Sequence, residues 1–355
     1  MKAILISNRF NPGHLSHMLA NRKLVTDVGY TVLFGWHKSF RVLSNNVFKN
    51  NEISKKILIT LKENDLVFLW FPSNAAVFDL LLVRLFTNST IVYIFHEPFS
   101  TFSSYRSSGF GFFKTVKITL VSIINYFLVS LSHKIILPSN TALLAYTARY
   151  DTIKSHAQFP LMFDDESSGA ILAVEERQYI AYIGTVAEDH AFDEFVKFAC
   201  YVLSNHLLAG GQKMLIATRS VLPSKIMAQL QNYVDTGLLV IQSGRPLSTE
   251  EINFFYASSF VVWNAYRRSM QSGVLPKAYM FGTPVIISSA NRSEFFDNHI
   301  TGIEVSNRYD CDEILCAVRL IIANFPAHSL ACRTTFLEKF YYKAFSNKFI
   351  EFVTT

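Results

Sequence analysis

The segment SGVLPKAYMFGTPVII, residues Ser272–Ile287, places the start of a helix, its end and a strand in one short run. A Ser-Gly pair precedes the helical stretch, and Gly282-Thr283-Pro284 ends it before the β-branched run Val285–Ile287. A helix that leads directly into a short apolar strand is typical of α/β proteins with parallel sheets. The segment therefore predicts both a fold class and a helix start.

The helix start predicts a seat for an anion. The first turn of a helix has unpaired N–H groups and a partial positive charge, so a diphosphate can approach the backbone closely at a Ser-Gly pair. The alternative interpretation of the same residues is an ordinary N-capped helix with a solvated lysine. The predicted seat is Ser272, Gly273 and Val274, and nearby full charges come from Lys277, Arg267 and Arg268.

On both sides of this segment, short apolar runs alternate with helical patterns. We therefore expect an α/β protein with two Rossmann-like, doubly wound parallel-sheet domains facing a cleft. The strands expected in the first half are Lys2–Ser7, Thr31–Trp36, Leu66–Phe71, Thr90–Phe95 and Lys134–Leu137. Those expected in the second half are Tyr179–Ile183, Lys213–Ala217, Leu238–Gln242, Phe260–Trp263 and Pro284–Ile287.

The length of 355 residues exceeds one ordinary domain, which typically has roughly 100–200 residues. A polar stretch with two acidic clusters, Asp164-Asp165-Glu166 and Glu175-Glu176, predicts a solvated linker. The expected parts are an N-terminal domain at 1–165, a linker at 166–178, a C-terminal domain at 179–331, and a C-terminal helix at 332–355 that crosses back to the first domain. Within that last part, Cys332–Phe352 is helical in pattern.

Composition narrows the function classes. The four cysteines form no CxxC pair, which favours free buried thiols in a reducing cytosol. The N-terminal apolar run is too short for a secretory signal, and the 15 residues of Ile118–Ser132 are too few to span a bilayer. The expected location is therefore cytoplasmic. A net charge of +6 favours an anionic partner, but the 33 Lys and Arg are scattered, which argues against nucleic acid.

The stretch from Ser272 to Val305 resembles the signature of retaining glycosyltransferases of the GT-B fold, family 4 type. The matching positions are Gly282–Ile286, Ser288, Glu294 and Gly302–Val305. Weaker similarity covers most of the chain, including NPGHLSHMLANRKLVTDVGYTVLF and YIAYIGTVAEDHAFDEFVKFA. The resemblance implies a hexosyltransferase-type enzyme that takes a UDP-, GDP- or dTDP-sugar as substrate, in a divergent branch of capsule, lipopolysaccharide or O-antigen synthesis.

The same resemblance implies roles for the two domains. The first would bind an oligosaccharide or lipid-linked acceptor, and the second would bind the nucleotide-sugar. The acidic pair usual in the family falls on Ser269 and Lys277, and its phosphate-gripping Arg and Lys fall on Thr185 and His190. The grip must then come from other basic groups. The donor-binding candidates are Gly13, His14, Thr185, Arg219, Gly244, Arg245, Pro246, Leu247, Tyr266, Arg267, Arg268, Ser272, Gly273, Val274 and Lys277.

His96-Glu97 follows a strongly apolar strand and matches the place where related enzymes carry a histidine near the reacting sugar. An imidazole there can donate a hydrogen bond or accept a proton, and Glu97 can orient it. A loop histidine that caps a strand is the alternative. Likewise, Gly13 and His14 either approach the donor phosphate or form a turn before a helix.

A basic and aromatic segment follows at Tyr105–Tyr126. A basic amphipathic helix with Phe at its start suits an anionic membrane surface, although a core helix with a solvated basic end fits equally well. The predicted membrane or acceptor patch is Arg106, Phe110, Phe112, Phe113, Lys114 and Lys117.

No DxD motif stands at the end of an expected strand, and the sequence has no P-loop or GxGxxG, so no metal site is expected and no cofactor is required. A GT-B enzyme can stabilise a leaving diphosphate with a helix dipole and basic side chains instead. The missing acidic pair keeps an alternative open, namely a catalytically degenerate binding partner of an active transferase.

Overall fold

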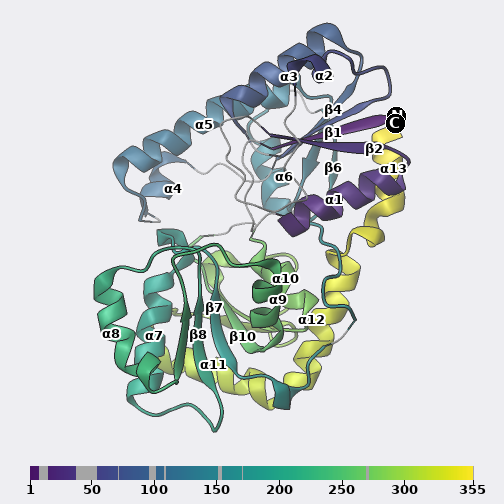
Figure 1. The fold of residues 1–355 in the computed structure, drawn as a ribbon. Helices are drawn as coiled ribbons and strands as arrows, with labels where there is room; N and C mark the ends of the chain where they lie inside the picture. The colour runs from purple at the N-terminus through teal and green to yellow at the C-terminus, as the bar shows by residue number, and fades with distance from the viewer. Residues whose placement is uncertain are drawn as a thin grey trace. The chain divides into compact units, whose positions relative to one another are not determined.

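The computed structural model describes residues 1–7, 15–36, 54–70, 72–95, 101–107, 109–150, 154–169, 171–268 and 272–354. The chain divides into two compact units (Figure 1). The first unit comprises Met1–Asp164 together with Tyr341–Thr355, and the second comprises Asp165–Phe340.

The first unit is built on a six-stranded parallel sheet in the order β2-β1-β3-β4-β5-β6. Its strands are β1 (Lys2–Ser7), β2 (Thr31–Trp36), β3 (Leu66–Leu69), β4 (Thr90–Ile94), β5 (Lys134–Leu137) and β6 (Ser155–Gln158). Its helices are α1 (Leu15–Asp27), α2 (Lys55–Leu58), α3 (Asn74–Phe86), α4 (Phe102–Ser107), α5 (Phe112–Leu131), α6 (Asn140–Thr147) and α13 (Ser346–Thr354), with a 3-10 turn, η6 (Tyr342–Phe345).

Both faces of this sheet are buried because successive strand residues point to opposite sides and are apolar on each. Leu5 and Phe68 pack on one side with α1 and α13, while Ile6 and Leu69 pack on the other with α3 and α5. The continuous apolar runs of the strands follow from this double burial.

The second unit repeats the plan with a parallel sheet in the order β12-β11-β10-β7-β8-β9. Its strands are β7 (Tyr179–Ile183), β8 (Lys213–Ala217), β9 (Leu239–Gln242), β10 (Ser259–Asn264), β11 (Val285–Ser288) and β12 (Gly302–Val305). Its helices are α7 (Phe192–Ser204), α8 (Ser224–Asp235), α9 (Thr249–Ala257), α10 (Val274–Met280), α11 (Cys311–Ala323) and α12 (Phe325–Lys339), with 3-10 turns η3 (Val174–Glu176), η4 (Glu188–His190) and η5 (Ser289–Asn291). The expected α/β class with two doubly wound parallel sheets is confirmed.

The segment Ser272–Ile287 forms the local structure that its letters predict. Helix α10 runs from Val274 to Met280 and leads through a short turn into β11. Gly282 ends the helix with a φ of +62°, and a Cβ there would lie 2.5 Å from the Ser329 hydroxyl. Glycine is therefore required at this turn by both conformation and space.

The C-terminal stretch differs from the single helix expected over Cys332–Phe352. Helix α12 ends at Lys339, and Tyr341 forms a parallel bridge with Phe163 of the first unit. The Tyr342 N–H donates to the Phe163 carbonyl at 3.0 Å, and α13 follows from Ser346. The helix breaks because the backbone is needed for this pairing.

The expected solvated linker is corrected in part: Glu175 and Glu176 are exposed, but Asp165, Glu166 and Arg177 are bound within the second unit. Asp165 pairs with Arg333, and Glu166 pairs with Lys277. Arg177 is 4% exposed and donates to Ser259 O, Thr283 Oγ1 and Phe281 O at 2.7–2.8 Å. The segment fastens β10 to the end of α10 instead of lying in solvent.

Helix α5 has 20 residues and is therefore longer than the 15-residue uncharged run seen in the sequence. By length and composition it is the one helix of the described chain that could cross a membrane; α11 and α12 pass the same test only as one span, bent by 86°. All four cysteines are free thiols, as expected, but Cys316 is exposed and only Cys332 is fully buried.

Candidate functional site

The carboxyl edge of the second sheet gathers most of the predicted donor-binding residues. All six strands run parallel, so the loops that follow them meet at one edge. Thr185 follows β7, Arg219 follows β8, and Tyr266 follows β10. Gly244–Leu247 follows β9, where Gly244 has a φ of +82°. Residues far apart in sequence are thereby brought to one edge of one unit.

Tyr266 and His190 form the aromatic part of this edge. Their rings are stacked, with centroids 4.5 Å apart and planes inclined by 8°. The Tyr266 hydroxyl lies 3.4 Å from the Ser272 hydroxyl, and burial raises the pKa of Tyr266 to about 12. Tyr266 therefore stays protonated at neutral pH and keeps a hydrogen available beside Ser272.

The predicted anion seat at the start of α10 is partly taken up by its own serine. The Ser272 hydroxyl accepts a hydrogen bond from the Val274 N–H at 3.1 Å. Helix α10 has seven residues, so its dipole is small. The seat therefore depends on the surrounding loops and side chains more than on the helix alone.

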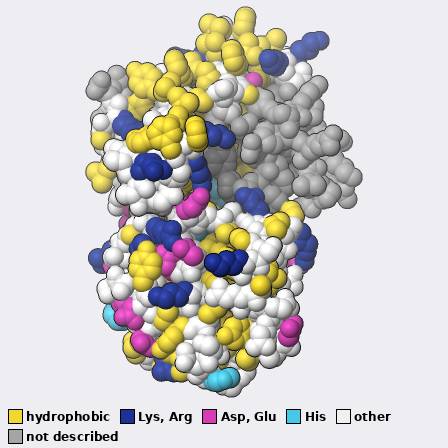
Figure 2. Space-filling model, turned by 90° about the vertical axis from the view of Figure 1, so that its left-hand side faces the viewer, with side chains coloured by type: hydrophobic (Ala, Val, Ile, Leu, Met, Phe, Trp, Pro, Cys, Tyr) yellow, Lys and Arg dark blue, Asp and Glu magenta, His cyan; other side chains and the backbone are white. Residues whose placement is uncertain are grey.

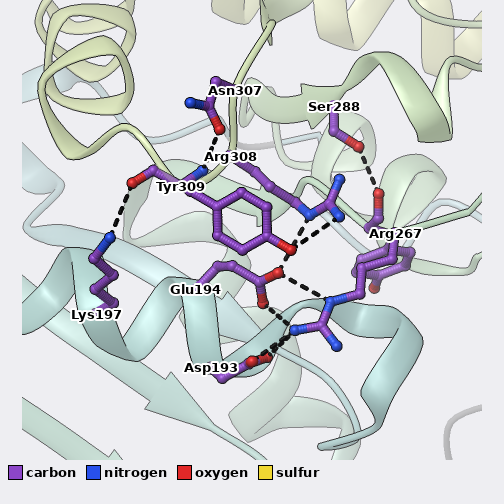
Figure 3. A network of polar contacts seen from close by, with 9 residues as sticks. Asp193, Glu194, Lys197, Arg267, Ser288, Asn307, Arg308 and Tyr309 are labelled. Atoms are coloured by element: carbon purple, nitrogen blue, oxygen red, sulfur yellow. Dashed lines mark hydrogen bonds and ion pairs between the residues drawn. The ribbon is translucent and has the colours of Figure 1, made fainter. Parts of the chain in front are cut away.

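Arg267 belongs to an ion-pair network that the sequence did not reveal (Figure 3). Its guanidinium contacts Asp193 at 2.6 Å and Glu194 at 2.7 Å, and Arg308 reaches the other oxygen of Glu194 at 3.2 Å. Burial, the largest single cause, raises the pKa of Glu194, but hydrogen bonds from Arg267, Asp193 and the backbone, together with the charge of Arg267, lower this pKa to about 2. Glu194 is therefore ionised and bound to two arginines.

The neighbouring arginines also have acidic partners. Arg268 Nε lies 3.0 Å from Asp189, a carboxylate that is only 6% exposed, and Arg245 pairs with Glu251 at the start of α9. The sequence predicted that these arginines would bind a phosphate. In the structure, Arg245, Arg267 and Arg268 are each paired with a carboxylate. The acidic residues of EDHAFDE, directly after the loop of β7, are the sequence feature that could have indicated partners for Arg267 and Arg268.

Lys277, which the sequence predicts among the donor-binding residues, has its hydrogen-bond partners inside the second unit. It is 6% exposed and lies where α10 packs against α9. Its ammonium donates to Glu166 at 2.6 Å and to Asn253 at 2.8 Å. Burial lowers the pKa of Lys277, opposed by the charge of Glu166. The lysine serves the internal packing of the second unit.

The predicted catalytic pair His96 and Glu97, and the donor candidates Gly13 and His14, lie outside the described residues. The strands that precede them, β4 and β1, end at the same edge of the first sheet, separated by β3. Among the described residues, no group of three His, Cys, Asp or Glu side chains is arranged to hold a metal ion.

The predicted membrane patch is present in part. Phe112 and Phe113 are exposed, the latter by 87%. Phe110 is corrected: it is 4% exposed, packs edge-on against Tyr105, and lies under the Lys114 ammonium at 4.4 Å. Arg106 is turned back to the Phe110 carbonyl at 2.6 Å.

The whole chain is similar to solved GT-B glycosyltransferases. One is HepE of Anabaena in complex with UDP and glucose, with a TM-score of 0.72 and 11% identity, covering 100% of this chain and 99% of that one. Others are a glycosyltransferase of Rickettsia africae (TM-score 0.68, 13% identity, 99% and 98% covered) and the sucrose-phosphate synthase of Thermosynechococcus elongatus (0.66, 13%, 99% and 98%).

No family model matches the chain, and no curated protein matches its sequence. The likeness to the solved structures extends over both units and establishes that the chain has the GT-B fold. At 11–13% identity it establishes the fold and nothing finer.

Proposed function

We propose that the protein is a retaining glycosyltransferase that moves a sugar from a nucleotide-diphosphate donor to a glycan or lipid-linked saccharide. The observation that carries this proposal is the gathering of Thr185, Arg219, Gly244 and Tyr266 at the carboxyl edge of one parallel sheet. Ligands of doubly wound sheets bind at that edge. Similar structures add support, since HepE was solved with UDP-glucose and a trehalose-6-phosphate enzyme of E. coli with UDP-2-fluoro glucose.

In this proposal the base of a UDP-, GDP- or dTDP-sugar lies against Gly244, Arg245, Pro246 and Leu247. The diphosphate lies near Ser272–Val274, where the Tyr266 hydroxyl and Thr185 donate hydrogen bonds and Arg219 and Arg268 supply charge. For Arg268, the diphosphate replaces Asp189 as the anionic partner. Positioned donors of this kind stabilise the charge that develops on a leaving diphosphate.

The acceptor hydroxyl is proposed to meet His96 and Glu97 of the first unit. The leaving phosphate then takes the acceptor proton on the same face of the sugar, so no protein nucleophile and no metal ion are needed. The proposed setting is bacterial surface polysaccharide synthesis at the cytoplasmic side of the cell membrane, with Arg106, Phe112, Phe113, Lys114 and Lys117 near anionic lipid.

The test has two stages. A thermal-shift screen with UDP, GDP, dTDP and CDP should raise the melting temperature with one nucleotide, because a bound nucleotide stabilises only the folded protein. Labelled sugars activated with that nucleotide should then be transferred to acceptors in a crude extract, or be slowly hydrolysed. If none of the four nucleotides raises the melting temperature, the proposed donor site in the second unit is wrong.

A catalytically degenerate binding partner of an active transferase is the second candidate. It is favoured by Ser269 and Lys277 at the positions of the family's acidic pair, and by the engagement of Lys277 with Glu166 and Asn253. Tight nucleotide binding without transfer or hydrolysis of any donor would favour this candidate over the enzyme.

A further inference from the structure

Helix α5 has large apolar residues on its solvent-exposed side, and its buried side includes two polar residues beside Leu128 and Val129. Leu120, Ile123 and Phe127 are each more than half exposed on its outer side. Thr115 and Asn125 are buried on its inner side, where Asn125 accepts a hydrogen bond from the Tyr93 hydroxyl of β4. An ordinary surface helix carries charged and polar residues on its outer side, so the exposed apolar residues of α5 are unusual.

Helix α3 packs beside α5 on the same face of the sheet and also exposes large apolar residues (Figure 1). Phe78, Leu81 and Leu85 recur at helical spacing on its outer side, with Phe78 and Leu85 about two-thirds exposed at 64% and 66%. Its single acid, Asp79, is buried. We call the outward residues of both helices the α3–α5 face: Phe78, Leu81, Leu85, Leu120, Ile123 and Phe127.

The charged residues near the start of α5 have one sign. The sequence from Pro98 to Tyr150 contains no aspartate or glutamate, and Arg106, Lys114 and Lys117 lie in this stretch, before and within the first turns of α5. Figure 2 shows hydrophobic side chains gathered over the upper part of the molecule, with lysine and arginine among them. An apolar face bordered by cations complements an anionic lipid surface.

The same helix does not suit a transmembrane orientation. Helix α5 connects β4 to β5, and its Leu128 and Val129 lie in the core under the sheet. Two lysines and the buried Asn125 would enter the hydrocarbon if it spanned the bilayer. A helix with one side fixed to a sheet and the other apolar lies in the plane of the interface.

We propose that the α3–α5 face docks on the surface of an anionic phospholipid bilayer, with both helices parallel to the membrane plane. This inference rests on the proposed membrane contact and extends it from the start of α5 along two helices. The apolar residues enter the boundary between headgroups and acyl chains, and Lys114 and Lys117 meet lipid phosphate. The basic end gives salt sensitivity, and the apolar ridge gives the part of the affinity that salt does not remove.

The test measures sedimentation of the full chain with vesicles of phosphatidylcholine alone or with 30% phosphatidylglycerol, an anionic fraction on the order of that in natural membranes. The wild-type chain should bind the anionic vesicles, and less at high salt. Leu120→Glu with Phe127→Glu should lower the partition coefficient by at least ~10-fold, as should Leu85→Glu with Phe78→Glu, since each places charge in the apolar layer. Val221→Glu with Leu330→Glu, which changes two similarly exposed residues of the second unit, should leave binding unchanged.

The nucleotide thermal shift of each variant provides the separate reading for the donor site and for folding. If both face variants bind the vesicles as well as the wild type does, the α3–α5 face is not the docking surface, although the protein still contacts the membrane. Absence of vesicle binding by the wild type would overturn both. A wild-type dimer that the face variants turn into monomers, with vesicle binding unaffected, would assign the face to a second copy of the chain and also overturn the inference.

Discussion

Glu194 joins two arginines that arrive from different loops of the second unit. Arg267 follows β10, Arg308 follows β12, and the carboxylate begins α7 with a side chain that is 2% exposed. Its place in the first turn of a helix adds a favourable interaction with the helix dipole. One buried carboxylate thus ties together three segments at the carboxyl edge of the sheet.

Replacing Glu194 by Gln should destabilise the second unit by about 1–3 kcal/mol, because Arg308 loses its carboxylate partner and Arg267 keeps only Asp193. Urea unfolding followed by circular dichroism measures the loss. The matched control is Asp193→Asn, whose side chain is 68% exposed, and it should cost less than about 1 kcal/mol. Equal effects of the two variants would show that burial does not govern this network.

His96 carries the residue-scale prediction for catalysis, and it stays a prediction because it lies outside the described residues. His96→Ala should lower turnover by about 10²-fold or more if the imidazole transfers a proton or stabilises charge. The nucleotide-induced thermal shift should remain, because the proposed donor seat belongs to the second unit. Turnover near the wild-type rate would remove His96 from the chemistry.

Helix α13 shows how an element can belong to a unit that is distant in sequence. Phe349 is fully buried and packs against Phe68 and Phe159 in the core of the first unit. The Phe352 carbonyl accepts a hydrogen bond from the buried Lys134 of β5 at 2.6 Å. The helix therefore completes one side of the first sheet.

Phe349→Ala should lower the free energy of unfolding of the first unit by about 3–5 kcal/mol, since the lost ring leaves a cavity in a packed core. The neighbouring Ile350 is 40% exposed, so Ile350→Ala should change stability much less. Calorimetry of both variants separates the outcomes. A shift confined to the transition of the second unit would contradict the assignment of α13.

At the element scale, the sequence predicted most of the strands and missed two. The strands β6 and β12 both lie at sheet edges. An edge strand buries less, so β6 has the polar sequence SHAQ and shows no apolar run. The end of α12 at Lys339 was also missed, because the bridge between Tyr341 and Phe163 joins residues that local patterns cannot relate.

Within the site, the sequence predicted the loops but not the state of their charges. The positions after β7 to β10 follow from alternation and from the rule that parallel strands end at one edge. The partner of Arg267 is Glu194, 73 residues away in the chain, and that of Lys277 is Glu166, 111 residues away. Such pairs depend on how strands are ordered, which spacing along the chain does not specify.

At the scale of the whole molecule, acid should act on the second unit first. Every described carboxyl group whose pKa is lowered belongs to that unit: Asp165, Glu194, Glu250 and Glu251. A carboxyl with a folded pKa below its unfolded value stabilises the protein fully above the unfolded value, and this contribution is lost as pH falls through the folded value. For Glu194 that window runs from its ordinary pKa of 4.5 down to about 2.

Lowering the pH from 6 to 3 should therefore lower the melting transition of the second unit more than that of the first. Asp193, whose pKa is raised mainly by burial, offsets part of the change. Trp263 is the one tryptophan of the second unit, so a chain with Trp36→Phe and Trp70→Phe reports that transition by fluorescence. A larger acid shift in the first unit would contradict the prediction.

The return of the chain to the first unit at Tyr341 has a consequence for biosynthesis. Residues 1–164 leave the ribosome before any residue of the second unit. Their core is nevertheless incomplete until Phe349, Phe352 and Val353 have been synthesised (Figure 1). The second unit can therefore fold while the first unit still lacks part of its hydrophobic core. A nascent chain tethered just after residue 340 should resist protease only within 165–340, and extension past 355 should protect the remainder; equal protection before that extension would refute this order.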